Sequence, residues 1–234
     1  MTLMEHMEEL RDRIVKVCLS IGGAFILGLF ASDPVLRFMK EQANAPQGFD
    51  IRSPTDSITI YMTIALYIAI AATLPIIVYH LVGFLSPGLT RKEKRVVYLS
   101  LPFVALLTVG GAAYGFFFAA RAALQFLSTF KSDIFAWEPD GGEVISFYLK
   151  LMVGLAVAFQ MPLIMFLLAK LNILGVRRMQ QYRRYAFVVI LILAAIITPT
   201  PDPFNLAFVA APLYLLYEVG IIISRIFARR PVEG

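Results

Sequence analysis

The sequence is short of charge, because Lys, Arg, Asp and Glu together make up only 16% of its 234 residues. Soluble domains carry about 25% charged and about 45–50% apolar residues, whereas 59% of this chain is hydrophobic. A soluble protein of this length would have to enclose several almost uncharged helices at once. The scarcity of charge therefore excludes an ordinary soluble domain.

Cysteine and histidine are equally scarce, with Cys18 the only cysteine and His6 and His80 the only histidines. A lone cysteine forms no intrachain disulfide, and neither histidine has a companion at metal-ligand spacing. There is also no nucleophile with a positioned base and no phosphate-binding glycine loop. We therefore expect no enzymatic activity, no metal and no cofactor. Without an internal repeat or a long linker, residues 1–234 are expected to form one domain.

The chain does contain long apolar blocks, and a helix of about 20 residues crosses a hydrocarbon core of about 30 Å. We predict an all-α membrane protein with six transmembrane helices at residues 17–31, 58–82, 96–127, 145–171, 185–198 and 204–223. The first block lacks a signal-peptide cleavage pattern and is predicted to be retained. The fifth is the shortest and rises only roughly 21 Å. Prolines inside the blocks predict kinked helices and a concave bundle; they are Pro75, Pro102, Pro162 and Pro212.

The basic residues are distributed unevenly between the segments that connect these blocks. If the N-terminus is cytoplasmic, the inner segments hold 15 of the 21 Lys and Arg residues. Cytoplasmic loops are enriched in basic residues, so we predict that both termini are cytoplasmic. The net charge of +5 then reflects topology and anionic lipid, and nucleic acid is not an expected partner.

A short amphipathic helix over residues 3–16 is predicted to precede the first span and to lie along the cytoplasmic interface. Its acidic residues include Glu8 and Glu9. The simplest interpretation of these charges is local: Glu9 and Arg13 form a mildly favourable i,i+4 pair, while Glu8 and Asp12 form an unfavourable one.

Two acidic residues, Glu9 and Glu93, stand in basic stretches that are predicted to face the cytoplasm. The rule that sets topology requires Lys and Arg there but no acids. A carboxylate binds a guanidinium in a forked, two-bond pair whose geometry Lys does not reproduce. Two carboxylates at one surface therefore suggest a receptor for a cationic ligand, although the sequence does not show that they converge.

Two polar side chains, Gln160 and Glu218, fall inside predicted spans. Such groups are costly in a membrane and face a partner or a wet cavity. Gln160 is expected either to bond to another helix of the fold or to contact a partner subunit. Glu218 is expected to reach towards Arg225 or to be neutral. A proton-coupled small-solute permease that uses these two residues is the alternative function, although the repeat symmetry common in such proteins is absent.

Three stretches together resemble one family. Residues 6–14, His-Met-Glu-Glu-Leu-Arg-Asp-Arg-Ile, resemble the His-Leu-x-Glu-Leu-Arg-x-Arg-Leu signature of TatC, the multi-spanning subunit of the twin-arginine protein translocase. Residues 75–95 resemble that family's second-span exit and first cytoplasmic loop, and residues 198–204 its tight turn between the last two spans. The similarity in order and spacing covers nearly the whole chain.

The resemblance implies a receptor in a prokaryotic inner membrane that recognises signal peptides with consecutive arginines. It also implies export of folded proteins driven by the protonmotive force. The family's recognition glutamates fall on Glu9 and Glu93. Further residues that match the family's site are Arg11, Phe84, Pro87, Gly88 and Arg95.

The implied partners are single-span subunits of the TatA and TatB types and further copies of the chain within a receptor complex. The fifth span is the expected TatB-type surface, and the fourth span near Gln160 is expected to meet a TatA-type helix. Many relatives carry Glu where this chain has Gln160, and a glutamine does not titrate. Glu8 adds an acid beside Glu9, so either carboxylate could face the cargo.

Overall fold

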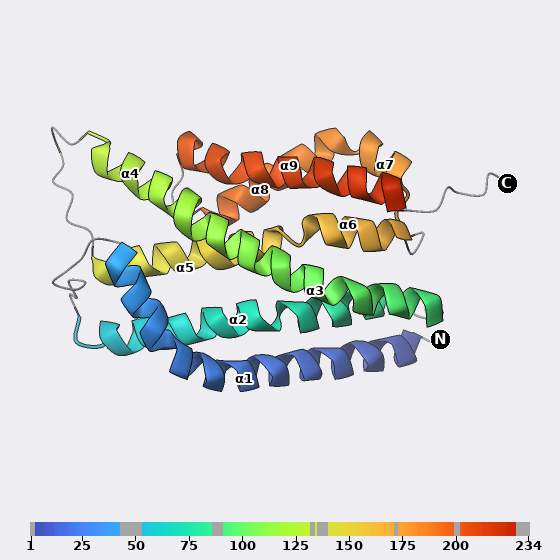
Figure 1. Cartoon of the computed structure of the whole chain (residues 1–234), viewed down its shortest axis with the longest axis horizontal. Helices are drawn as coiled ribbons and strands as arrows, with labels where there is room; N and C mark the ends of the chain where they lie inside the picture. Colours follow the sequence, from blue (N-terminus) through green and yellow to red (C-terminus); the bar gives the residue numbers. More distant parts are fainter. Residues whose placement is uncertain are drawn as a thin grey trace.

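The computed structural model describes residues 3–42, 53–85, 91–131, 134, 140–170, 173–198 and 202–227. Within these ranges every regular element is helical, so the prediction of an all-α fold is confirmed. The long helices lie side by side in one bundle (Figure 1).

The first helix, α1, is continuous from Leu3 to Gln42 and is 40 residues long. Residues 3–16, predicted as a short amphipathic helix before the first span, are helical and continue into that span without a break. No proline interrupts the chain before Pro34, and the Gly22–Gly23 pair costs helical stability without breaking the hydrogen-bond ladder. The helix changes direction towards its C-terminal end (Figure 1), in the part that contains Pro34.

The second helix, α2, spans Asp56–Leu85 and packs along α1, which has its main contacts there. The two backbones approach closely at Gly28, where a Cβ atom would lie 2.6 Å from the carbonyl oxygen of Ala65. Nearby, the Tyr61 hydroxyl donates to the Leu29 carbonyl at 2.7 Å. Close packing and this hydrogen bond hold α1 against α2, while near its C-terminal end Phe38 also stacks on Phe116.

The third apolar block forms α3 (Arg91–Tyr114), a π-helical turn η1 (Gly115–Ala120) and α4 (Arg121–Thr129), which follow one another without a loop. This stack packs against α5, which spans Gly141–Ala158.

In the fourth block a turn at residues 159–160 separates α5 from α6 (Met161–Lys170), and the two together form one span, Gly141–Lys170. Pro162 has no backbone N–H to donate to the preceding turn and so contributes to the interruption, although Pro75, Pro102 and Pro212 lie inside helices that continue. The chain continues through a short helix that was not predicted, α7 (Val176–Gln181). It ends with α8 (Arg183–Ile197) and α9 (Pro203–Phe227).

Within the described ranges, five helical segments are long and apolar enough to cross a membrane: Met7–Glu41, Asp56–Leu81, Tyr98–Thr129, Gly141–Lys170 and Pro203–Ile226. The predicted fifth span corresponds to α8, which at 15 residues is shorter than these. The starts of α1 and α3 and the ends of α2, α6 and α9 lie together at one end of the bundle (Figure 1). We call this the basic end, since the predicted inner basic segments begin or finish there.

Candidate functional site

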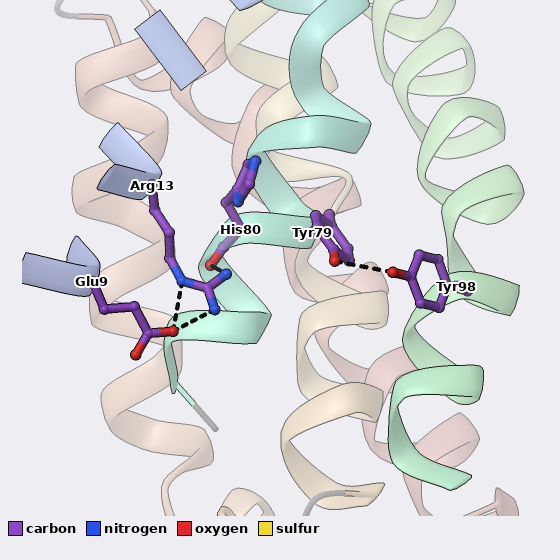
Figure 2. A network of polar contacts seen from close by, with 5 residues as sticks. All are labelled: Glu9, Arg13, Tyr79, His80 and Tyr98. Atoms are coloured by element: carbon purple, nitrogen blue, oxygen red, sulfur yellow. Dashed lines mark hydrogen bonds and ion pairs between the residues drawn. The ribbon is translucent and has the colours of Figure 1, made fainter. Parts of the chain in front are cut away.

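Glu9 and Arg13 form an ion pair at the start of α1, one helical turn apart (Figure 2). Arg13 Nε donates to Glu9 Oε1 at 3.0 Å, and Arg13 Nη2 donates to the same oxygen at 2.5 Å. The side chain of Arg13 is only 23% exposed and that of Glu9 only 25%. The i,i+4 pair predicted from the sequence is confirmed, but it is more enclosed than a solvated surface pair.

Arg13 also reaches across to α2, where its Nη1 donates to the backbone carbonyl of His80 at 3.3 Å (Figure 2). Space for the guanidinium exists because residue 83 is glycine: a Cβ atom there would lie 2.5 Å from Arg13 Nη1. His80 therefore contributes through its backbone, while its buried Nδ1 has no hydrogen-bond partner in the part of the chain described. The ion pair is thus attached to two helices.

The second oxygen of the Glu9 carboxylate, Oε2, is buried and accepts no hydrogen bond from the described residues. Buried acceptors are nearly always paired, so an unused one calls for an explanation. Glu8, its neighbour, is exposed. Of the two adjacent acids, Glu9 is the one enclosed between α1 and α2, with half of its hydrogen-bonding capacity unused.

A second contact joins α2 to α3 beside this ion pair. The hydroxyls of Tyr79 and Tyr98 lie 3.1 Å apart, and their ring centroids are 5.5 Å apart (Figure 2). No local pattern in the sequence predicts this contact, although both tyrosines flank the same connection between spans. The tyrosine pair positions the start of α3 relative to the part of α2 whose His80 carbonyl accepts the hydrogen bond from Arg13.

The other predicted recognition residues are described unequally. Glu93 lies in the first turn of α3, at the basic end, but its side chain lies outside the described residues. Pro87 and Gly88 lie outside them altogether. Phe84 is half-buried in the last turn of α2, and Arg95 is exposed on α3.

Arg11, the remaining predicted residue, is directed to solvent. Its side chain is 78% exposed, and Nη2 lies 3.5 Å from an oxygen of Asp12, at the limit of a hydrogen bond. The arginine that contacts Glu9 is therefore Arg13, for which the sequence predicts only a local i,i+4 ion pair.

Gln160 is enclosed within the fold at 1% exposure. Its Nε2 donates to the carbonyls of Val104 and Ala156 at 3.3 and 3.1 Å and to Thr108 Oγ1 at 3.1 Å. Of the two alternatives left open by the sequence, the structure has the internal one. The side chain is buried within the chain and does not reach its surface.

Glu218 pairs with Arg183 rather than with Arg225, at 2.8 Å between Oε2 and Nη2. The expected partner was wrong because α8 begins beside the final turns of α9, a contact that no local pattern reveals. The two side chains are 28% and 48% exposed. Glu218 therefore belongs to a partly solvated pair at the basic end.

We expect Glu218→Gln to lower the free energy of unfolding by at most about 1 kcal/mol, since half-exposed ion pairs contribute little. Arg183→Gln should have a similar effect, and the double variant should add almost nothing. Thermal unfolding in detergent measures both. Glu41→Gln, an exposed acid on α1, is the control. If the Glu218→Gln protein kept its stability but lost small-solute transport, that result would instead favour the permease alternative.

Two cavities lie away from the Glu9–Arg13 pair. One of about 560 Å³ is at the opposite end of the bundle, and its lining includes Asp56, Glu143 and Lys150. The other, of about 510 Å³, is an apolar groove between α3, α6 and α9. Among the described residues, no three His, Cys, Asp or Glu side chains are grouped as a metal site would need. Glu9 and its surroundings remain the best candidate for ligand recognition.

Residues 5–212 match the family model of the Sec-independent protein translocase protein, TatC. The chain is 33% identical to the Sec-independent protein translocase protein TatCy of Bacillus subtilis over 232 residues, covering 98% of this chain and 91% of that one. It is 34% identical to TatC of Helicobacter pylori strain J99 over 236 residues, covering 99% and 92%. It is similar to a crystal structure of the twin-arginine translocase receptor TatC, with a TM-score of 0.79 and 27% identity. The match covers 96% of this chain and 100% of that one.

Proposed function

Because the chain belongs to the TatC family of Sec-independent protein translocases, we propose that it is the receptor subunit of a twin-arginine translocase. In this role it binds twin-arginine signal peptides, and its translocase exports folded proteins using the protonmotive force. The observation that carries the proposal is the Glu9 carboxylate, which is held at the basic end with one buried oxygen unused. The comparisons give no support to a small-solute permease.

The proposed recognition site consists of carboxylates that bind the guanidinium groups of the signal peptide. Glu9 Oε2 is a charged acceptor in a partly enclosed place, where solvent screens an ion pair less than in bulk water. Glu93, in the first turn of α3 at the same end, is the proposed second carboxylate. The residues proposed to shape the site around them are Arg11, Phe84, Pro87 and Arg95.

The protein is a multi-pass membrane protein, and we propose that its basic end faces the cytoplasm of a prokaryote. The excess of Lys and Arg at that end supports this orientation, with both termini inside. Six crossings require α8 to be a span although it rises only about 22 Å. Local thinning of the bilayer or packing against a partner accommodates such a helix.

The surface of α8 supports the proposal that a single-span subunit, of the TatB type, binds there. Several of its large apolar side chains are exposed: Phe187, Val188, Ile192 and Ile196. A short helix with an apolar outer face gains lipid-like packing from a second helix beside it. We also propose that a TatA-type subunit contacts the fourth span without involving the enclosed Gln160 amide. Further copies of the chain are proposed to belong to the same receptor complex.

Binding of a labelled signal peptide to the detergent-purified protein tests the proposal. We expect a peptide with two consecutive arginines to bind about tenfold more tightly than the same peptide with two lysines, since only a guanidinium offers a planar fork. Glu9→Gln and Glu93→Gln should each abolish most of this preference. Fluorescence anisotropy gives the dissociation constants directly.

Glu41→Gln is the matched control, because Glu41 is an exposed acid near the other end of the same helix. It should leave both dissociation constants unchanged. Circular dichroism and gel filtration must show that each variant remains helical and monodisperse. If wild-type protein binds the arginine and lysine peptides equally well, the receptor proposal fails.

A further inference from the structure

Arg13 is held more firmly than a helical ion pair requires. Its guanidinium donates from Nε and Nη2 to one oxygen of Glu9 and from Nη1 to the His80 carbonyl on α2 (Figure 2). Three donors pointing at two acceptors on different helices leave the group little freedom. The orientation of the Glu9 carboxylate is therefore set by the packing of α1 on α2.

The same helix provides a built-in comparison. Arg37 and Asp33 form another i,i+4 pair, with 2.8 Å between Nε and Oδ2, but their side chains are 76% and 56% exposed. That pair has the features of a solvated surface pair, whose contribution is small. The Glu9–Arg13 pair differs in burial and in its contact with a second helix, not in spacing.

Glycine at position 83 completes the arrangement. A Cβ atom at this position would lie 2.5 Å from Arg13 Nη1 and 3.2 Å from Cζ. The Arg13 guanidinium therefore fits against the α2 backbone only while residue 83 lacks a side chain. Since the clash involves the far end of a flexible side chain, a larger residue would displace Arg13 rather than separate the helices.

We propose that Arg13 is a positioning residue that determines the selectivity of the site for arginine over lysine. This inference rests on the proposed function. Arg13 occupies Oε1, so Oε2, which is buried and accepts no hydrogen bond from the described residues, is the acceptor that an incoming cation must uncover. It also neutralises most of the charge of Glu9, so a ligand gains little from charge alone.

This neutralised carboxylate favours guanidinium over ammonium. An ammonium ion is a compact, strongly hydrated charge and would lose much of its water to approach one oxygen beside another cation. A guanidinium is weakly hydrated, directs its donors in one plane and stacks against neighbouring planar groups. Without Arg13, Glu9 becomes an ordinary carboxylate that attracts either cation.

The test measures dissociation constants for the twin-arginine and twin-lysine peptides with Arg13→Gln, Arg13→Lys and Gly83→Ala. We expect the ratio of the twin-lysine to the twin-arginine dissociation constant to fall about tenfold in Arg13→Gln. A tenfold change corresponds to the loss of roughly one hydrogen bond to a charged group. Arg13→Lys should lose most of the ratio, because one ammonium does not reproduce contacts to both Glu9 and the His80 carbonyl. Gly83→Ala should lower the ratio while keeping every charge.

Arg37→Gln and Gly110→Ala are the matched controls, since the first breaks the exposed pair and no atom lies within 4 Å of a Cβ at the second. Both should keep the wild-type ratio. A damaged fold would weaken both peptides together and leave the ratio intact, so the ratio separates positioning from structure. In the Glu9→Gln background, Arg13→Gln should have no further effect on the ratio.

Three results would overturn the inference: an unchanged ratio in Arg13→Gln, tighter binding of both peptides with the ratio kept, or an effect that persists without Glu9. The second would identify Arg13 as a competitor for the ligand instead. A wild-type protein without any preference for arginine is a different result, because it contradicts the proposed function itself.

Discussion

Gly111→Ala is expected to lower the melting temperature of the detergent-solubilised protein by roughly 6–12 °C, corresponding to about 3 kcal/mol. A Cβ atom at Gly111 would lie 2.6 Å from the Leu155 carbonyl oxygen and 2.7 Å from the Ala156 Cα on α5. Both atoms belong to the backbone, so neither moves without shifting a helix. The variant would force α3 away from α5 at the level where Gln160 bonds to α3.

Gly110→Ala is the control for this prediction, because Gly110 is the preceding residue on the same helix and its Cβ would meet no atom within 4 Å. Replacing an exposed helical glycine by alanine improves helix propensity by up to about 1 kcal/mol, so this variant should be as stable as the wild type or more so. Equal melting temperatures for the two variants would show that α3 and α5 are not packed as closely as the structure has them.

The helices were largely predictable from the sequence because their apolar blocks are long and nearly uncharged. What the sequence did not reveal were the boundaries set by local chemistry. The predicted interfacial helix merges with α1, since no residue between 3 and 33 stops a helix. The fourth block, still one span over Gly141–Lys170, is interrupted by a turn at residues 159–160, close to Pro162, which removes one backbone donor.

The candidate site was predictable only in part. The i,i+4 spacing of Glu9 and Arg13 gave the ion pair, because helical neighbours follow from the sequence alone. The contact of Arg13 with His80 spans 67 positions and depends on Gly83, so it required the packing of α1 on α2. The Arg183–Glu218 pair was missed for the same reason, being 35 positions apart. Contacts between helices are a property of the fold and not of any local pattern.

The packing of α1 on α2 also connects the middle of the bundle with the proposed site. Gly28 lies where the two backbones are closest, and Arg13 is 15 residues away along α1, or about 22 Å. α1 has its main contacts with α2, and Phe38, which stacks on Phe116, lies near the C-terminal end of α1, away from Arg13. A change at Gly28 should therefore be transmitted to the Arg13–His80 hydrogen bond, which at 3.3 Å is already long.

Gly28→Ala is accordingly expected to reduce the preference for a twin-arginine over a twin-lysine peptide about tenfold, besides lowering stability by about 2–3 kcal/mol. The added Cβ would lie 2.6 Å from the Ala65 carbonyl oxygen and 3.3 Å from its Cα, so the helices must separate locally. Peptide binding and thermal unfolding are measured on the same preparation.

Gly23→Ala is the control, because it changes the same helix where a Cβ meets no atom within 4 Å; it should keep the arginine preference and should not lower the stability. If Gly28→Ala loses stability but keeps the arginine preference, α1 bends between the two positions and the site is positioned locally by Arg13 and Gly83. If both are lost, the α1–α2 interface acts as one rigid unit. Selectivity at the basic end then depends on how closely two helices approach in the middle of the bundle.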